Sequence, residues 1–361
     1  MSNRNKGKYF SVKDLKQIEK GCDYLFLLGE RSNGKSYAVK ENVLTQAYDA
    51  INEDGICTKQ LAYIRRFDLD CKDSVCEPYF ADMPVSTITN GDYTLISVYR
   101  KKIYFANIDE KGKVNRQICI GQCFALSAAE HYKSLMFPFI MNVIYEEVIS
   151  LNNQYLYNEP SQLQQIISSI LRDRRGKIYL IGNTISRFCP YYREFGFEDV
   201  DRLEEGTGQL YVFNDTKIRV YRTKSRNYNS GLFFGNAAKN ITQGEYVTEE
   251  QPHLQHRFND YMILYSAVLE YENRCYLMQL LRYKNDPKII TWYVQPKTTP
   301  VQPKTRVISN RYNPDPLYSN GFLPFTNTEQ KIFNMLLREN RVCFSDNLTG
   351  TEFKNILKVF K

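Results

Sequence analysis

Apolar residues in the first part of the chain follow two spacings. Apolar runs of strand length lie at 22–28, within 137–150 and at 178–181, as expected for strands buried in a parallel sheet. Other apolar residues recur every three or four positions, as on one face of a helix: Val39, Val43 and Ala47, and then Leu163, Ile166, Ile167, Ile170 and Leu171. Strands alternating with helices predict an α/β domain with a mostly parallel sheet.

The pattern changes in the C-terminal part of the chain. It predicts a hairpin from 261–271 and 275–283, a strand at 292–294, and helices at 328–338 and 352–360. Turn-forming and charged residues at 206–235 are typical of a linker. We therefore expect a first domain over 1–205, a linker over 206–235 and a small α+β domain over 236–361.

Length and composition narrow the class of protein. A chain of 361 residues with 43% hydrophobic residues can bury the cores of two domains. No apolar run reaches the roughly 18 residues of a membrane span, and the start is polar and basic, so we expect a soluble, non-secreted protein. The nine cysteines lack the spacing of a zinc site and are interpreted as reduced thiols. With only three histidines, catalysis is expected from carboxylates, lysines and arginines.

The net charge of +8 is unevenly distributed. Residues 224–361 contain 18 basic and 12 acidic side chains, so most of the positive excess lies there. A solvated surface explains this bias, and so does a surface that binds a polyanion. The two interpretations remain open at the level of sequence.

Residues 29–36 read GERSNGKS and fit the phosphate-loop pattern G-x-x-x-x-G-K-[ST]. The expected strand precedes the motif and the expected helix follows it, which is the context that the motif requires. In such a loop the backbone amides cradle phosphates, Lys35 reaches the β and γ oxygens, and the Ser36 hydroxyl binds Mg²⁺. A loop that has lost nucleotide binding is the alternative.

An acidic pair follows the second apolar run. Glu146 and Glu147 lie where the expected strand ends, so Glu146 is a candidate to support Mg²⁺ and Glu147 a candidate general base. A strand that simply ends in an exposed acidic turn is the alternative.

A basic segment, RDRRGK, separates the second helix from the third apolar run. Arg172 is a candidate arginine finger that acts on the nucleotide of a neighbouring subunit. Arginines that only complement the helix dipole are the alternative. Asn183, just past the strand, is placed to sense the γ-phosphate.

The motifs together resemble those of the DNA-packaging ATPases, or DNA encapsidation proteins, of small short-tailed bacteriophages with protein-primed linear genomes. The resemblance is carried by GERSNGKSYA at 29–38, YIRR at 63–66, IYEE at 144–147, LRDR at 171–174 and GNTISRFCPYY at 182–192. It covers roughly residues 20–200 with motifs, and the remainder by size and layout. One departure is the Glu-Glu pair, where the family usually has Asp-Glu, so the division of roles between Glu146 and Glu147 stays open.

The resemblance implies a P-loop NTPase of the additional-strand, catalytic-glutamate type, with ATP and Mg²⁺ as cofactors. Its implied nucleotide-binding residues are Gly29, Arg31, Asn33, Gly34, Lys35, Ser36, Tyr37 and Asn183. The implied metal-binding residues are Ser36 and Glu146, and the implied catalytic residues are Lys35, Glu147 and Arg172. Arg65 would couple the nucleotide state to the catalytic glutamate.

The implied function is a viral genome packaging motor that hydrolyses ATP to translocate double-stranded DNA into a procapsid. Its implied partners are viral DNA, the portal and further copies of the chain in a ring, usually a pentamer; use of a packaging RNA stays open. The protein would act in the host cytoplasm and transiently at the portal vertex, would contact no membrane, and is not expected in the mature virion.

The resemblance also implies that the C-terminal domain is nuclease-like, of the RNase H type. Glu270, Glu272 and Asp286 are the nearest candidates for an acidic metal cluster, and we expect the domain to bind without cutting. Candidate DNA contacts are Lys111, Lys113 and Arg116 in a hairpin loop, and Lys297, Lys304 and Arg306 near a repeated VQPKT segment. For both loops a simply solvated surface is the alternative.

Other functions fit parts of this pattern. They are a packaging terminase with an active nuclease, a small-molecule kinase or nucleoside-triphosphate switch, and a helicase. A kinase needs a substrate pocket and no ring, whereas the acidic pair and Arg172 favour the packaging motor.

Overall fold

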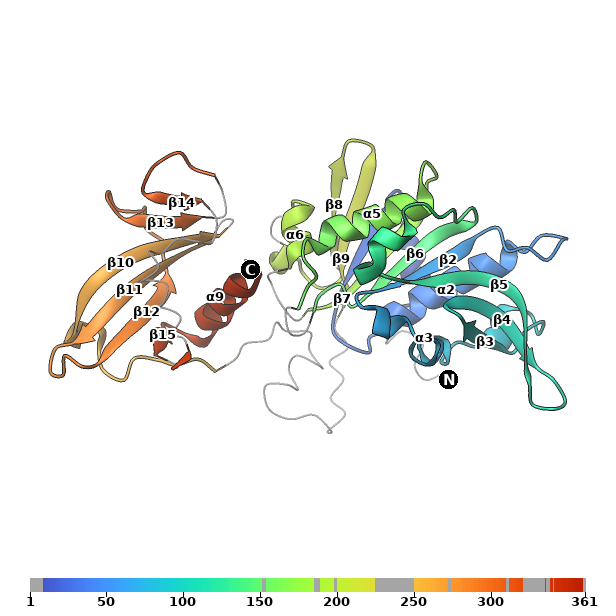
Figure 1. Ribbon diagram of the computed structural model, residues 1–361, viewed down its shortest axis with the longest axis horizontal. Coiled ribbons are helices and arrows are strands. Elements are labelled where there is room, and N and C mark those ends of the chain that lie inside the picture. The colour runs from blue at the N-terminus through green and yellow to red at the C-terminus, as the bar shows by residue number, and fades with distance from the viewer. Residues whose placement is uncertain are drawn as a thin grey trace. The chain divides into compact units, whose positions relative to one another are not determined.

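The computed structural model describes residues 9–150, 154–184, 189–197, 200–224, 250–271, 274–309, 312–320, 335, 338–339 and 341–359. The chain divides into two compact units, Met1–Tyr246 and Val247–Lys361. Figure 1 shows a twisted sheet with helices in the first unit and a smaller sheet in the second. No helix in the described part of the chain is both long and apolar enough to cross a membrane.

The first unit contains a nine-stranded sheet in the order β3-β4-β5-β2-β6-β7-β1-β9-β8. Its strands are β1 (Tyr24–Gly29), β2 (Gln60–Arg65), β3 (Leu95–Tyr99), β4 (Lys102–Ile108), β5 (Val114–Ala125), β6 (Ile140–Glu146), β7 (Lys177–Asn183), β8 (Thr207–Phe213) and β9 (Thr216–Arg222). The six central strands, from β5 to β9, are parallel, and antiparallel pairs extend the sheet at both sides. The expectation of a mostly parallel α/β sheet is confirmed.

Helices cover both faces of this sheet. They are α1 (Val12–Ile18), α2 (Lys35–Asp49), α3 (Asp73–Phe80), α4 (Val85–Ile88), α5 (Glu159–Leu171) and α6 (Pro190–Glu194), with short 3₁₀ turns at Asp68–Cys71, Leu126–Tyr132 and Val200–Arg202. Side chains of β1 alternate: Phe26 and Leu28 pack with α5, whereas Leu25 and Leu27 pack with α2. The continuous apolar run of β1 is therefore explained by burial on both faces.

Parallel pairing brings the ends of the central strands to two edges of the sheet. Gly29 of β1 pairs with Asn183 of β7, and Glu146 of β6 pairs with Ile181 of β7. β7 thus lies between β1 and β6. We call the edge where these strands end the carboxyl edge, and the edge where they begin the amino edge. Loops at the carboxyl edge are where open parallel sheets bind ligands.

The structure contains two strands in the first part of the segment 206–235 that was expected to be a linker. Thr207–Phe213 and Thr216–Arg222 form the β8–β9 hairpin, and β9 pairs in parallel with β1. The turn-rich sequence correctly indicated that most of β8 is exposed to solvent. It did not indicate that β8 is hydrogen-bonded to β9 at the side of the sheet. The first domain therefore continues past residue 205 to at least Arg222, and residues 225–249 lie outside the described part.

The second unit contains a six-stranded mixed sheet in the order β14-β13-β10-β11-β12-β15. Its elements are β10 (Tyr261–Tyr271), β11 (Arg274–Tyr283), β12 (Ile290–Pro296), β13 (Arg306–Ser309), β14 (Tyr318–Asn320), β15 (Val342–Phe344), a 3₁₀ turn at Phe258–Asp260 and helix α9 (Asn347–Val359). The predicted β10–β11 hairpin, the following strand and the last helix are confirmed. The helix predicted at 328–338 falls largely outside the described residues.

Candidate functional site

The phosphate loop connects β1 to α2, and its two motif glycines are required by close packing. A Cβ on Gly29, which has φ of +152°, would lie 2.0 Å from the Thr223 hydroxyl, and Gly34 has φ of +99° at the helix N-cap. Thr223 follows β9, accepts a hydrogen bond from the Asn33 amide at 2.5 Å and donates one to the Leu28 carbonyl at 2.9 Å. The loop is thus fixed by a residue far away in the sequence.

Lys35 is held inside this loop by oxygen atoms. Its Nζ donates to the Glu30 carbonyl at 2.6 Å and lies 3.3 Å from Asn33 Oδ1 and 3.5 Å from Asn183 Oδ1. Burial lowers the pKa of Lys35 to about 8, although the carboxylates of Glu146 and Glu30 act in the opposite direction. Because burial removes water from the ammonium group, an anion such as a phosphate placed beside it would stabilise its charged form. Arg31 is exposed on the loop, and Tyr37 is half-buried in the first turn of α2.

The two glutamates of the acidic pair have different environments. Glu146, the last residue of β6, is 8% exposed and accepts a hydrogen bond from the Tyr79 hydroxyl at 2.7 Å. Burial raises the pKa of Glu146, and hydrogen bonds from Tyr79 and Ser36 partly oppose this. Glu147 lies just beyond the strand, and its side chain is 57% exposed and pairs with Arg65 at 3.0 Å. The difference supports a metal-side role for Glu146 and a water-facing role for Glu147.

The residues present fit a magnesium ion that is bound together with phosphates. Ser36, in the first turn of α2, and Glu146, at the end of β6, offer oxygen ligands from two different elements near the buried Lys35, and the Ser36 hydroxyl opposes the rise in the pKa of Glu146. No group of three or more His, Cys, Asp or Glu in the described residues could hold a metal alone. Mg²⁺ commonly uses one or two protein oxygens plus substrate phosphates and water, which matches this donor set.

Arg172 lies at the amino edge, away from the phosphate loop. It caps the C-terminus of α5 with φ of +54°, and its Nη2 donates to the Leu135 carbonyl at 3.3 Å. With Arg174 and Arg175 it borders a cavity of about 730 Å³ that also contacts the first residues of β1 and β9. The six residues of β1 separate the two edges by about 20 Å, at about 3.3 Å per residue. Arg172 therefore does not reach the loop of its own chain.

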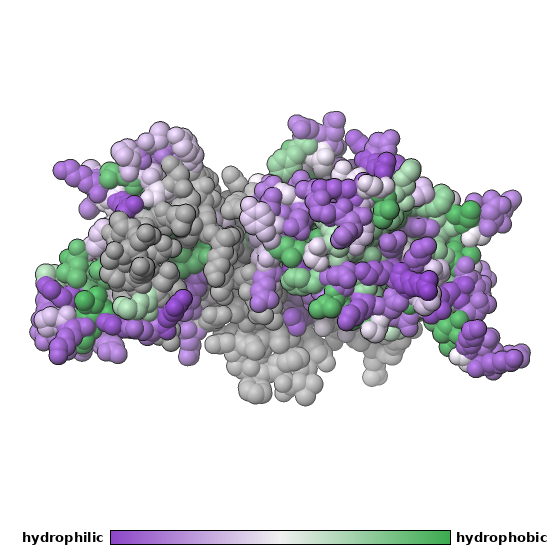
Figure 2. All heavy atoms as spheres, viewed as in Figure 1, coloured by the Kyte–Doolittle hydropathy of each residue, from purple (hydrophilic) through white to green (hydrophobic). Residues whose placement is uncertain are grey.

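The candidate DNA contacts of the first unit differ in their surroundings: two lysines are exposed, and one arginine has partners within the chain. Lys111 and Lys113 lie at the exposed tip of the β4–β5 hairpin, where both backbone amides donate to the Asp109 carboxylate. Arg116 instead donates to the Ser97 hydroxyl at 3.1 Å and stacks 4.6 Å over the Tyr99 ring. Figure 2 shows hydrophilic atoms at the hairpin tip.

The candidates in the second unit do not form one cluster. Glu270 is at the β10 end of the β10–β11 turn, whereas Asp286 follows the other end of β11, so the two carboxylates cannot share a metal ion. Glu272 lies outside the described residues. Lys297 donates to the Thr299 hydroxyl at 2.8 Å, Lys304 has φ of +69° in the following loop, and Arg306 begins β13 with Nε 3.4 Å from the Ser319 hydroxyl.

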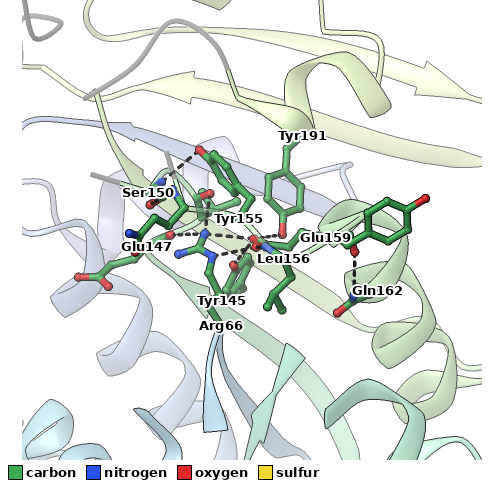
Figure 3. A network of polar contacts seen from close by, with 12 residues as sticks. Arg66, Tyr145, Glu147, Ser150, Tyr155, Leu156, Glu159, Gln162 and Tyr191 are labelled. Carbon is green, nitrogen blue, oxygen red and sulfur yellow. Dashed lines mark hydrogen bonds and ion pairs between the residues drawn. The ribbon is translucent and has the colours of Figure 1, made fainter. Parts of the chain in front are cut away.

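A buried network beside the acidic pair was not predicted from the sequence. Arg66 and Glu159 form an ion pair at 2.8 Å with side-chain exposures of 8% and 0%. The hydroxyls of Tyr145 and Tyr191 both donate to Glu159 at 2.7 Å (Figure 3). Arg66 belongs to the YIRR motif, but nothing in the sequence indicates its partner, which is 93 residues away.

The whole chain resembles two solved structures of phage packaging motors. One, titled the Phi-28 gp11 DNA packaging motor, is 16% identical, covers 98% of each chain and has a TM-score of 0.50. The other, the bacteriophage Phi-29 viral genome packaging motor assembly, is 17% identical, covers 98% of this chain and 100% of that chain and has a TM-score of 0.55. The chain has the fold of phage DNA packaging motor proteins.

A third structure resembles part of the chain. The N-terminal domain of the DNA packaging ATPase from bacteriophage phi29 is 21% identical and matches 63% of this chain and 99% of that chain, with a TM-score of 0.43. No family model and no curated protein sequence matches the chain. The likeness to packaging motors is therefore one of fold.

Proposed function

We propose that this chain is the ATPase subunit of a phage motor that drives double-stranded DNA into a procapsid. The observation that carries the proposal is the meeting of buried Lys35 with buried Glu146 at the carboxyl edge, beside the Arg65–Glu147 ion pair. The whole-chain likeness to packaging motors supports the choice of substrate. The position of β7 between β1 and β6 supports the additional-strand, catalytic-glutamate class.

The residues of the carboxyl edge have distinct roles in the proposed hydrolysis. The amides of the loop and the Lys35 ammonium would bind the phosphates of ATP, and Ser36 and Glu146 would hold Mg²⁺. Bound magnesium neutralises charge on the phosphates. Glu147, exposed beside them, would accept a proton from the attacking water. Asn183 Oδ1 lies near Lys35 Nζ, where a terminal phosphate would be sensed.

The Arg65–Glu147 pair would regulate this step. As long as Arg65 holds the carboxylate at 3.0 Å, Glu147 is oriented toward the end of β2 and is not available to the attacking water. Release of the pair would free Glu147 for catalysis. Because the Glu147 side chain is more than half exposed, the net stabilisation by the pair is small and a modest movement is sufficient to break it.

Arg172 would complete the site of a neighbouring subunit. It lies at the amino edge, so a head-to-tail ring is the arrangement that brings it to another chain's nucleotide. We therefore propose a homo-oligomeric ring, a pentamer by resemblance, on the portal of the procapsid. Exposed Leu135 and Met136 next to Arg172 are suited to burial in such a contact.

Further expected contacts extend this proposal. The hairpin lysines Lys111 and Lys113 would contact DNA phosphates, and the second unit, as a nuclease-like domain without cutting activity, would bind DNA, portal or packaging RNA. Glu270 lies at the turn end of the β10–β11 hairpin and Asp286 beyond its open end, which argues against the alternative of an active nuclease. Action in the host cytoplasm and at the portal vertex, and absence from the mature virion, belong to the same proposal.

The experiment that tests the function is ATP turnover with and without long double-stranded DNA. We expect DNA-stimulated turnover in the unaltered protein and its loss in Lys35→Ala, Glu147→Gln and Arg172→Ala. Mixing Glu147→Gln with Arg172→Ala subunits should restore part of the activity, because an intact glutamate then meets an intact arginine from the next chain. Turnover that ignores DNA would refute the translocase and leave an ATPase of another kind.

A further inference from the structure

Two consecutive arginines at the end of β2 have different partners. Arg65 binds the Glu147 carboxylate, which is half-exposed. Arg66, whose side chain points to the opposite face, binds the fully buried carboxylate of Glu159 at the start of α5. The first pair can break and re-form, whereas the second is enclosed by protein.

The Glu159 carboxylate is saturated with hydrogen bonds. Its Oε2 accepts from Arg66 Nε at 2.8 Å and from the Leu156 amide at 2.9 Å. Its Oε1 accepts from Arg66 Nη2 at 3.1 Å and from the hydroxyls of Tyr145 and Tyr191. A buried network of which every member is satisfied has one rigid arrangement. The guanidinium of Arg66 is thereby held in a fixed position (Figure 3).

The same guanidinium also binds the backbone that directly follows β6. Arg66 Nη2 donates to the carbonyl of Glu147 at 3.0 Å and to that of Val148 at 3.3 Å. Glu147 has φ of +57°, a left-handed conformation that a glutamate rarely adopts and that needs support from its surroundings. The backbone that carries the general base is therefore supported by Arg66.

We propose that Arg66, held by Glu159, is a positioning residue for ATP hydrolysis that fixes the backbone of Glu147 and so orients its carboxylate toward the attacking water. This inference rests on the proposed function, in which Glu147 is the general base. Arg65 controls whether the carboxylate is available, and Arg66 controls where the carboxylate is located. Small displacements of a catalytic group lower the rate strongly, because reaction requires close alignment.

The test is steady-state ATP turnover by the full-length protein carrying Arg66→Lys. Lysine keeps the charge but lacks the planar fork that joins Glu159 to the two carbonyls. We expect kcat to fall about 10- to 100-fold, with KM nearly unchanged because the phosphate loop is intact. Glu159→Gln, which removes the anchoring charge, should show the same pattern. Thermal melting of each variant separates this effect from loss of folded protein.

A matched control is Arg274→Lys in the second unit. Arg274 donates to Glu352 at 2.8 Å, and Glu352 also accepts from the Tyr276 hydroxyl at 2.9 Å, so the control alters a similar cluster remote from the phosphate loop in sequence. We expect it to leave kcat without DNA unchanged. If kcat in Arg66→Lys and Glu159→Gln stays at the level of the unaltered protein, or falls only in proportion to folded protein, the positioning role is wrong.

Combination with Glu147→Gln distinguishes this inference from the proposed function. If Arg66 acts through Glu147, Arg66→Lys should cause no further loss of single-turnover rate in a Glu147→Gln background, because groups that act as a unit are not additive. Independent, multiplying losses would overturn the positioning role alone. Full turnover in Glu147→Gln would overturn the base assignment and, with it, the role of Arg66.

Discussion

The two edges of the first sheet differ in how complete their chemistry is. The carboxyl edge assembles Lys35, Glu146, Glu147 and Arg65 within one chain, with the ion pair and hydrogen bonds already formed. The amino edge presents Arg172 beside a cavity, together with exposed Leu135 and Met136. Parallel strands produce this separation, because residues before and after a strand lie a full strand length apart. In this sheet, the proposed nucleotide-binding residues lie at the carboxyl edge, and the residues expected to contact another chain lie at the amino edge.

The basic hairpin belongs to the amino edge as well. Leu61 near the start of β2 pairs with Gly121 of β5, so the earlier residues of β5, which pair only with β4, extend beyond the start of β2 and carry Lys111 and Lys113 at their tip. The long β4–β5 hairpin is visible as a projection in Figure 1. Side chains that would meet other molecules are thus collected away from the phosphate loop.

The largest predicted effect tests whether the amino edge is catalytic. Arg172→Ala should lower DNA-stimulated ATP turnover by about 10³-fold or more, the range of an arginine finger, while nucleotide affinity is retained. Turnover and binding of a fluorescent ATP analogue would be measured side by side. Arg175→Ala, which alters the same cavity, is the control and should remain active. If Arg175→Ala is inactive and Arg172→Ala is not, the finger is assigned to the wrong arginine.

The next effect tests the carboxyl edge. Lys35→Ala should lower turnover by about 10²- to 10³-fold and weaken ATP binding, because a buried ammonium group facing the phosphates is removed. In a mixture of Lys35→Ala and Arg172→Ala subunits, activity should return only where an Arg172→Ala subunit holds the nucleotide. That subunit keeps Lys35, and its Lys35→Ala neighbour supplies Arg172. Lys177→Met removes another partly buried lysine, which binds the carbonyls of Glu19 and Cys22, and should leave turnover intact. Normal ATP binding by Lys35→Ala would contradict the assignment of the loop.

The affinity for ATP is expected to change about tenfold per pH unit on the alkaline side. Burial lowers the pKa of Lys35 to about 8, and a bound phosphate would raise it by favouring the ammonium form. Affinity for ATP should be full below about pH 8 and fall up to about tenfold per pH unit above it. Titrations between about pH 7 and about pH 9 would show this. Lys35→Arg keeps its charge and should lose the dependence; if it does not, another group titrates.

The smallest effect concerns the hairpin. The double variant Lys111→Ala and Lys113→Ala should reduce the slope of log affinity for DNA against log salt concentration by about two, one unit for each lost phosphate contact. Basal ATP turnover should not change, because the hairpin is remote from the loop. Lys133→Ala, an exposed lysine paired with Glu130, is the control. An unaltered slope in the double variant would remove the hairpin from the DNA-binding surface.

Much of the first unit could be predicted because its signals are local. The unbroken apolar run of β1 and the helical spacing in α2 and α5 predicted these elements, and GERSNGKS predicted the loop between them. The β8–β9 hairpin was missed because turn-rich, exposed residues resemble a linker, and its pairing with β1 depends on a distant strand. The pairing of Arg66 with Glu159 was missed for the same reason.

The sequence by itself determined the order of elements and the chemical types at each position, because periodicity and short motifs act over a few residues. Only the tertiary structure decided which of those residues meet. Parallel pairing of β1, β7 and β6 brought Lys35 to Glu146 and kept Arg172 away from both. Burial then distinguished Glu146 from Glu147, because the end of β6 is enclosed and the next residue is not. Identical side chains thereby acquired different exposure, different partners and different proposed roles.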